Sequence, residues 1–224
     1  MKIKYLVILI FGICCSVNGQ KVFPILESSE EKFQHITSED GLMHNSIAAI
    51  LQDSKGYMWF GTSNGLYKYN GYDFKYYTNS PDDDSTLLNK QVKTLFEDKK
   101  GHIWIGTAEG ICIYDRSSDS FNNYLGSEIN KVNQIKESIN CIYEDNNGVF
   151  WVGTKLGLYK LILDGDNGFI TELITYGTSK EGLSSNSVLS IIEDTNDNLW
   201  IATNNGLNLF RESEDGRASC RERV

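Results

Sequence analysis

Short apolar runs separated by turn-forming residues make up most of this chain. In the first clear run, strand alternation would place Ile47, Ala49 and Leu51 on one face. The second run, at residues 57–62, is apolar on both faces, as expected for a strand sandwiched between sheets. The dipeptide Asn70-Gly71 is a strong hairpin signal between the last two runs. The four predicted strands are residues 46–52, 57–62, 66–69 and 73–78. The pattern predicts one small antiparallel sheet of four strands.

The same pattern returns three more times. In every copy an Asp precedes a Trp by six residues, and a Gly follows that Trp by six. The tryptophans recur at intervals of 45, 47 and 49 residues, and all four in the chain occupy this position. The shared positions are Asp53, Asp98, Asp145 and Asp194; Trp59, Trp104, Trp151 and Trp200; Gly65, Gly110, Gly157 and Gly206. A period in the forties with strand-like content is typical of a propeller blade. We therefore predict an all-β fold, a β-propeller of four-stranded antiparallel blades with about four blades present.

The repeated residues also suggest how such blades would stack. One four-stranded sheet cannot bury both of its faces, whereas neighbouring sheets cover one another. Each indole would supply a large part of the contact between blades. Small residues would leave room for it: one column holds Ala49, Thr94, Cys141 and Ser190, and another holds Gly61, Gly106, Gly153 and Ala202. We expect the four tryptophans to lie between successive sheets.

The repeats occupy residues 32–211 and are followed by sequence that leaves the pattern. Their approximate bounds are 33–78, 91–125, 138–176 and 187–210. Residues 33–37 (F-Q-H-I-T) alternate as an exposed strand would. The fourth repeat reaches Phe210 without a fourth strand. Residues 215–224 share nothing with the period and are interpreted as an off-pattern tail.

The N-terminus is predicted to be a signal peptide. Lys2 and Lys4 precede an apolar segment at residues 5–17, and small or tolerated residues surround a cleavage point near Gly19. The apolar segment is short of the about 20 residues of a membrane helix. Residues 1–19 are therefore assigned to the signal and residues 20–31 to a polar leader, the alternative being an uncleaved anchor.

Composition narrows the class of partner. The chain has 224 residues, 40% of them hydrophobic, and a net charge of −9. No stripe of Lys and Arg accompanies the aromatics, so nucleic acid is a poor candidate. Cys112, Cys141 and Cys220 remain after the signal, with no disulfide framework and no metal-ligand spacing. We expect no cofactor and no metal.

Catalytic chemistry is not indicated either. His35, His44 and His102 occupy different repeat positions, so they predict no catalytic or metal cluster. Acidic pairs such as Glu97-Asp98 recur at the turns, where turn chemistry and solubility are favoured over a ring for Ca²⁺. Acids spread around a ring would not form the spaced pair that glycoside cleavage needs. The chain is predicted not to be an enzyme.

Ligands of propellers usually meet the loops around the central channel. The innermost strands are preceded by residues that differ in charge while the core columns agree. These candidate ligand-binding residues are Asn45, Lys90, Glu137 and Asn186. The alternative is that they are ordinary loop residues. Tyr72, Tyr76 and Tyr77 could stack on sugars as exposed aromatics, or could cover a sheet edge.

The repeat N-S-I-x-x-I-x-x-D-x-x-G-x-x-W-x-G-T-x-x-G-L-x-x-Y resembles the two-component regulator propeller repeat. The resemblance covers residues 33–210, and the departures, Asp197 and Ala202, both lie in the fourth copy. It implies the periplasmic sensor half of a hybrid two-component system, as in gut Bacteroidetes. Such sensors carry two seven-bladed propellers, a β-sandwich, a membrane helix, a histidine kinase and a DNA-binding response regulator.

The resemblance also implies a function, partners and a location. Relatives respond to oligosaccharides, so the chain is expected to be a periplasmic ligand-sensing fragment of an inner-membrane-anchored parent, without its kinase and DNA-binding modules. Its expected partners are an oligosaccharide, the remaining blades and β-sandwich, and a second copy in a homodimer. The alternatives are a propeller lyase or glycosidase and a purely structural interaction propeller.

Whether the blades close into a ring stays open at this point. A strand at residues 33–37 could pair beside residues 207–210 and complete the fourth blade of a small ring. The favoured alternative is a partial arc of a seven-bladed propeller, because four blades fall short of the number in the family.

Overall fold

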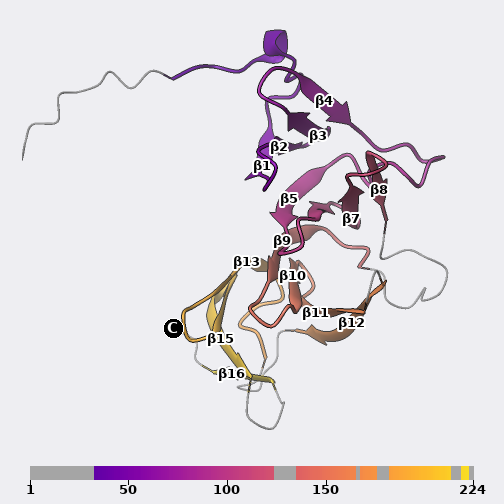
Figure 1. Ribbon diagram of the computed structural model, residues 1–224. Helices are drawn as coiled ribbons and strands as arrows, with labels where there is room; N and C mark the ends of the chain where they lie inside the picture. The colour runs from indigo at the N-terminus through magenta and orange to yellow at the C-terminus, as the bar shows by residue number, and fades with distance from the viewer. Residues whose placement is uncertain (1–32, 124–134, 165–166, 176–181, 213–217, 222–224) are drawn as a thin grey trace, which may run out of the picture. The chain divides into compact units, whose positions relative to one another are not determined.

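The computed structural model describes residues 33–123, 135–164, 167–175, 182–212 and 218–221. The chain divides into two compact units, residues 1–35 and residues 36–224. Of the first unit only residues 33–35 are described, and they have no regular secondary structure. The predicted signal peptide and leader lie outside the described residues. All strands formed by the described residues belong to the second unit (Figure 1).

The described strands form four separate sheets, each of four antiparallel strands in chain order. We call these sheets blades 1 to 4. Blade 1 comprises β1 (Ile47–Gln52), β2 (Met58–Thr62), β3 (Gly65–Tyr69) and β4 (Phe74–Tyr77). Blade 2 comprises β5 (Val92–Glu97), β6 (Ile103–Thr107), β7 (Gly110–Asp115) and β8 (Ser120–Asn122). These bounds confirm the four-stranded blade that the apolar pattern predicts.

The second half of the chain repeats this arrangement. Blade 3 comprises β9 (Ile139–Glu144), β10 (Phe150–Thr154), β11 (Leu158–Asp164) and β12 (Asn167–Ile174). Blade 4 comprises β13 (Val188–Glu193), β14 (Leu199–Thr203), β15 (Gly206–Glu212) and β16 (Ala218–Arg221). The first strand of each blade lies beside the first strand of the next, β1 by β5, β5 by β9 and β9 by β13.

Two expectations about the ends of the repeats are wrong. Residues 33–37 form no strand, and a short 3₁₀ helix, η1 (Ser38–Asp40), follows them. Blade 4 does have a fourth strand, because β16 pairs with β15 between Leu209↔Arg221 and Glu212↔Ala218. Strand pairing uses backbone groups, so residues outside the repeat pattern can still fill an edge. A strand at residues 33–37 was predicted to pair beside residues 207–210. That edge of blade 4 is occupied by β16 instead.

The hydrophobic core lies between the blades. Trp59 and Leu66 of blade 1 pack with Val92, Ile103 and Ile105 of blade 2 in one buried cluster. Equivalent clusters join blade 2 to blade 3 around Trp104, and blade 3 to blade 4 around Trp151. Each of these indoles meets an aromatic ring of the following blade, with centroid distances of 4.8 Å to Tyr114, 4.4 Å to Phe150 and 5.0 Å to Phe210. Stability therefore comes from contacts between neighbouring blades.

A glycine two residues after the Trp of blades 1 to 3 allows this close approach. A Cβ built on Gly153 would lie 2.5 Å from Cys141 Sγ and 2.6 Å from Val188 Cγ1 of the following blade. Such distances are far shorter than ordinary van der Waals contact, so any side chain there would push the blades apart. Gly61 and Gly106 are equally crowded, whereas blade 4 carries Ala202 at this position.

For Tyr77, the alternative of an exposed ring that stacks on sugars is wrong. Tyr77 is buried between blades 1 and 2 and contacts Trp59, Tyr114 and Phe121. It therefore belongs to the core, whereas Tyr72 is exposed.

The described residues include no helix with the length and apolar character needed to span a bilayer.

Candidate functional site

An Asp–Trp clasp fixes one end of every blade. In blade 2, Asp98 Oδ2 accepts a hydrogen bond from Trp104 Nε1 at 3.0 Å. Its Oδ1 accepts from the backbone N–H groups of Lys100 and His102 at 2.9 and 2.8 Å. The Trp–Asp distances in the other blades are 2.9 Å for Trp59–Asp53, 2.8 Å for Trp151–Asp145 and 2.9 Å for Trp200–Asp194. One carboxylate thus closes the turn between the first two strands and orients the indole.

These hydrogen bonds shift the acidity of the clasp. Burial acts to raise the pKa of the Asp98 carboxyl, but donors from Trp104 and His102 outweigh it, so the pKa is lowered. For Asp53 burial again opposes the shift, and Trp59, Arg116 and Tyr57 lower the pKa. The carboxylates of Asp53 and Asp98 are therefore held in the charged form by the fold.

A second repeated contact joins each clasp to the next blade. The Glu that ends the first strand of a blade accepts a hydrogen bond from the residue after the Asp in the preceding blade. We call this contact the glutamate latch. Its members are Ser54 N to Glu97 at 2.7 Å, Lys99 N to Glu144 at 2.7 Å and Asn146 N to Glu193 at 2.9 Å.

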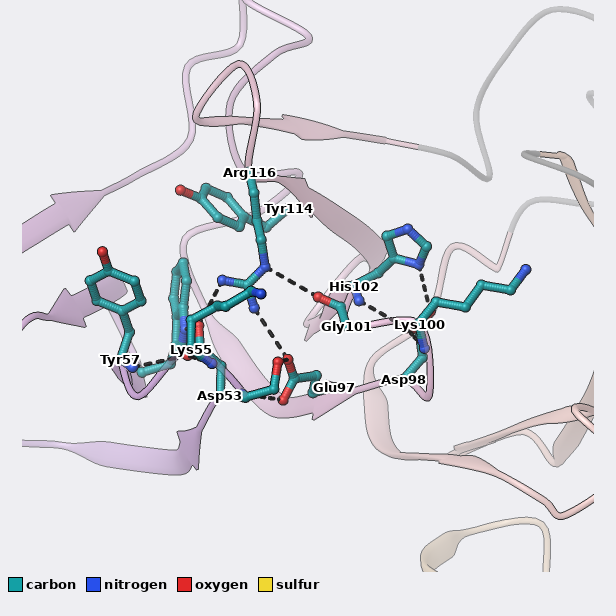
Figure 2. A network of polar contacts seen from close by, with 12 residues as sticks. Asp53, Lys55, Tyr57, Glu97, Asp98, Lys100, Gly101, His102, Tyr114 and Arg116 are labelled. Atoms are coloured by element: carbon teal, nitrogen blue, oxygen red, sulfur yellow. Dashed lines mark hydrogen bonds and ion pairs between the residues drawn. The ribbon is translucent and has the colours of Figure 1, made fainter.

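At the junction of blades 1 and 2 an arginine reinforces the latch. Arg116 donates to Asp53 Oδ2 at 2.9 Å, to Glu97 Oε1 at 3.2 Å and to the carbonyl oxygen of Gly101 at 3.2 Å. Figure 2 shows the guanidinium lying between Asp53 and Glu97, with the His102 ring beside Asp98 on the other side. A planar guanidinium suits this role because its fixed donors reach several oxygens at once.

A further polar contact lies nearer the outer strands of the same junction. Asp119 accepts from the hydroxyls of Tyr77 and Tyr114 at 2.7 and 2.5 Å and pairs with Lys75. Burial opposes the shift, but the Lys75 and tyrosine hydrogen bonds lower the pKa of Asp119 to about 2. Burial and Asp119 together raise the pKa of Tyr114 to about 12. This contact joins blades rather than exposing reactive groups.

The rim that carries the clasps is therefore structural. The clasp and latch oxygens already accept N–H groups of the protein, as turn chemistry predicts. Among the described residues, no group of three or more His, Cys, Asp or Glu side chains is placed to hold a metal. Free Cys112 is buried, and burial raises its thiol pKa to about 12, which leaves it unreactive.

The four predicted ligand residues lie at the opposite ends of the first strands. Asn45, Lys90, Glu137 and Asn186 each precede the first strand of a blade by two residues. Because these first strands are neighbours, the four loops follow one another along a single rim, which we call the loop rim. Asn45 and Lys90 are exposed, whereas Glu137 and Asn186 are half-buried.

Glu137 already has a partner within the protein. It accepts a hydrogen bond from the Tyr159 hydroxyl at 2.8 Å. Burial and this contact raise the pKa of Tyr159 to about 12. Asn186 also has an interaction. The exposed part of the predicted set is therefore Asn45 and Lys90, on adjacent loops of blades 1 and 2.

The structure adds residues to this rim that the sequence did not indicate. His44 Nε2 lies 2.8 Å from Asn64 Nδ2, which links the loop before β1 to the turn between β2 and β3. Gly65 N donates to the carbonyl oxygen of Lys90 at 2.6 Å, so this turn also contacts the loop of blade 2. These pairs are distant in sequence, and only the repeated turn glycine marked the position.

The glycine of this turn has a strict backbone role. Gly65 has φ of +120°, in the region that L side chains avoid, and its Cβ would lie 2.6 Å from the carbonyl oxygen of Tyr77. Thr62 Oγ1 donates to the Gly65 carbonyl oxygen at 2.9 Å and closes the turn. The last glycine of the repeat thus shapes the loop rim.

Four-stranded blades packed through an indole between them define a β-propeller. Four segments of the chain match the family described as two component regulator propeller, at residues 41–64, 86–109, 133–155 and 182–205. Each segment contains the first two strands of a blade, its clasp and its loop-rim residues. The chain belongs to this family of propeller-repeat proteins.

Other proteins are similar to this chain in part of its sequence or in its fold. A stretch of 61 residues is 39% identical to "Histidine kinase P4" of Formosa agariphila and covers 27% of this chain and 4% of that protein. The extracellular domain of the hybrid two component system BT4673 from B. thetaiotaomicron is similar over 79% of this chain and 25% of its own, with a TM-score of 0.63 and 23% identity. Virginiamycin B lyase from Staphylococcus aureus is similar over 84% of this chain and 57% of its own, with a TM-score of 0.54 and 18% identity. The chain thus spans a small part of the kinase and a quarter of the BT4673 domain.

Proposed function

We propose that this chain is part of the extracytoplasmic sensor of a hybrid two-component signalling protein and that it binds an oligosaccharide signal. The family assignment and the partial identity with a histidine kinase support the signalling class. The signal peptide inferred from the sequence supports a periplasmic location. Further blades, a β-sandwich and a membrane anchor of a longer protein are the expected covalent partners, and the blades present form a partial arc of a seven-bladed propeller.

The loop rim is the proposed binding surface. The observation that carries this proposal is the contrast between the two rims: the clasp rim repeats its Asp and Trp in every blade, whereas the loop rim changes from Asn to Lys to Glu to Asn. Amide, amine and carboxylate groups at successive positions can hydrogen-bond the hydroxyls of a sugar chain. Asn45 and Lys90, which are exposed on adjacent loops, are its proposed first contacts.

We propose that the chain binds without turnover. A propeller lyase or glycosidase is the alternative, and the similarity to virginiamycin B lyase concerns the fold alone. The two exposed residues proposed as first contacts, Asn45 and Lys90, carry an amide and an amine, which suit hydrogen bonding to sugar hydroxyls. A structural propeller that binds no sugar is the third possibility.

Calorimetric titration of the purified chain with a panel of oligosaccharides tests the proposal. At least one glycan should bind saturably and raise the melting temperature, because a ligand that binds only the folded state stabilises it. Lys90→Ala and Asn45→Ala should each weaken binding about 5- to 30-fold, as expected for the loss of one or two hydrogen bonds.

Lys55→Ala provides the matched control. Lys55 is an exposed lysine on the clasp rim, so its loss should leave the affinity unchanged. Equal weakening by Lys55→Ala and Lys90→Ala would contradict the assignment to the loop rim. Chromatography of the glycan after incubation separates binding from catalysis, since new products would favour the enzyme. No binding across the panel would favour the structural propeller.

A further inference from the structure

Every blade carries a β-bulge near the start of its first strand. In blade 1 the pairing of β1 with β2 skips Ala48, because Ile47 pairs with Thr62 and Ala49 pairs with Gly61. The same position is skipped in the other three blades, so each first strand has one extra residue there. The bulge residues are Ala48, Lys93, Asn140 and Leu189. A bulge interrupts the pairing and re-aims a side chain, and bulges are over-represented next to active sites.

The bulges lie on the sheet edge formed by the first strands, which we call the inner edge. In every sheet the first strand is a terminal strand, and the first strands of successive blades are neighbours. Asn140 shows the contact that results, since its Nδ2 donates to the Val188 carbonyl oxygen of β13 at 2.7 Å. Lys93 occupies the equivalent position of blade 2 and is half-buried. The bulges therefore add a second row of side chains, three residues after the loop-rim residue of each blade.

Blade 2 places a lysine in each of these two rows. Lys90 is its exposed loop-rim residue, and Lys93 is its bulge residue. Three residues of a strand span about 10 Å, so the two long, flexible side chains can reach the same bound group. In the part of the chain that the structure describes, neither ammonium group takes part in an ion pair or a hydrogen bond, whereas Lys75 pairs with Asp119. Both charges are therefore open to a bound anion.

The backbone that carries the two lysines is fixed by hydrogen bonds on both sides of Lys90. Within the loop, Asn89 Oδ1 accepts from Gln91 N at 2.8 Å. The carbonyl oxygen of Lys90 accepts from Gly65 N of blade 1 at 2.6 Å. The carbonyl oxygen of Gln91 accepts from Ala108 N of blade 2 at 3.0 Å. A segment that is ordered before binding loses little conformational entropy on binding, so the two lysines are preorganised.

Charge is distributed unevenly between the two rims of a chain whose net charge is −9. The clasp rim carries an aspartate in every blade and a latch glutamate in blades 2 to 4, against Lys55, Lys99 and Lys100 in its turns. Lysines instead outnumber carboxylates among the three residues before each first strand, the bulges and the turns between second and third strands. These charged residues are Lys90, Lys93, Lys136 and Lys155, with Glu109 and Glu137. An anion is therefore attracted to the loop rim and repelled by the clasp rim.

From these observations we propose that Lys90 and Lys93 bind an anionic group of the oligosaccharide, which is therefore an acidic one. The inference rests on the proposed function and names the substrate class of the same rim. The anionic group is the carboxylate of a uronic acid or a sulfate ester, and either forms charge-assisted hydrogen bonds with ammonium groups. Ala48, the small and exposed bulge residue of the neighbouring first strand, leaves room for a sugar ring beside Lys93.

Calorimetric titration of the full chain with matched pairs of glycans tests the inference. Oligomers of galacturonic acid are compared with the same oligomers after methyl esterification, and sulfated galactan oligomers with their desulfated form. The charged member of at least one pair should bind about tenfold or more tightly than its neutral partner. Raising sodium chloride from about 50 mM to about 500 mM should weaken the binding of the charged member alone, because salt screens exposed charges. The pair that shows the difference distinguishes a carboxylate from a sulfate ester.

Replacing each lysine by methionine removes the charge and keeps an unbranched apolar side chain. Lys90→Met and Lys93→Met should each weaken the binding of the charged glycan about 5- to 20-fold, and Lys93→Arg should restore most of the affinity. Lys55→Met is the matched control, because it removes the same charge from an exposed position of the clasp rim and should leave the affinity unchanged. Thermal unfolding followed by circular dichroism verifies that each variant is folded.

The outcomes separate this inference from the proposed function. Equal affinity for the charged and neutral members of both pairs would overturn the inference and leave the proposed function intact, since a glycan would still bind. An affinity unchanged in Lys93→Met would exclude the bulge lysine and overturn the inference as well. Equal weakening by Lys55→Met and Lys93→Met would do the same, because it would trace the effect to net charge. If neither charged nor neutral glycans bind, the proposed function fails and the inference fails with it.

Discussion

Trp151 and Trp200 occupy the same position in successive repeats, yet only one of them lies in the core. Both donate to an aspartate six residues earlier, at 2.8 Å and 2.9 Å. Trp151 is 2% exposed because blade 4 covers it, whereas Trp200 is half-buried. The hydrogen bond is therefore a local property of the repeat, while burial is supplied by the following blade. The two positions allow the local and the neighbour contributions to be measured separately.

Removing each indole should give the largest difference between the two positions. Trp151→Ala should lower the free energy of unfolding by about 3–5 kcal/mol, as for other buried large-to-small changes. Trp200→Ala should lower it by about 1–2 kcal/mol, because less apolar area leaves the interior. Urea denaturation followed by circular dichroism measures both. Equal losses would show that the covering blade contributes little to stability.

Exchanging glycine and alanine beside the two indoles should have unequal effects. Gly153→Ala should cost about 1–3 kcal/mol, since the new Cβ would collide with Cys141 and Val188. Ala202→Gly should cost only about 0.5–1 kcal/mol, the usual penalty of glycine within a strand. The same denaturation experiment gives both values. An unchanged free energy of unfolding for Gly153→Ala would mean that the blades can move apart at no cost in stability.

Substitution of a clasp carboxylate should also lower the free energy of unfolding more at a buried position than at a half-buried one. Asp98→Asn replaces an acceptor of the Trp104 N–H by a group that can turn a donor toward it, and Asp98 is buried. We expect a loss of about 1–3 kcal/mol, as for a buried donor left without a partner. Asp194→Asn should cost less, because Asp194 is only half-buried. Thermal unfolding of the two variants makes the comparison, and a larger loss at Asp194 would contradict it.

Acid should weaken the protein through the same carboxylates. The pKa values of Asp53 and Asp98 are lowered in the folded chain, so the unfolded chain binds protons first as the pH falls below about 4. Their stabilisation should be complete above the unfolded pKa and lost as the pH falls through the folded pKa. Urea midpoints at neutral and acidic pH test this. Asp98→Asn should reduce the slope in the acidic window, and an unchanged slope would exclude Asp98 as a contributor.

The glutamate latch should give the smallest effect. Glu144→Gln keeps an acceptor for Lys99 N but removes the charge, so a loss of about 0.5–1.5 kcal/mol is expected. Gln52→Glu introduces a charge at the equivalent exposed position of blade 1 and serves as the control, with no change in the unfolding free energy expected for the single chain. Chemical denaturation at low protein concentration measures both without contribution from association.

The repeat pattern alone predicted most of the fold. Strand alternation, the Asp-centred turn and the Asn-Gly turn are local features, and backbone geometry converts them directly into strands and hairpins. The repeat pattern did not predict the strands correctly at the two ends of the array. Residues 33–37 alternate like a strand but form none, and β16 pairs through its backbone without any repeat signal.

For the candidate site the sequence identified positions, and the tertiary structure assigned their contacts. The spacing located Asn45 and Lys90 before the first strands, but only the folded blade 3 shows that Glu137 accepts a hydrogen bond from Tyr159 of β11. The latch glutamates appeared as turn acids because their donors lie 43 to 47 residues away.

By itself, then, the sequence determined the strands of a blade and the Asp–Trp pair, because these depend on residues near one another in the chain, and it determined the period, because the tryptophans recur at nearly constant intervals. Only the tertiary structure decided which indoles are buried and which acids join blades. Those properties belong to surfaces that meet between repeats, and a repeated sequence looks the same whether or not a neighbour covers it.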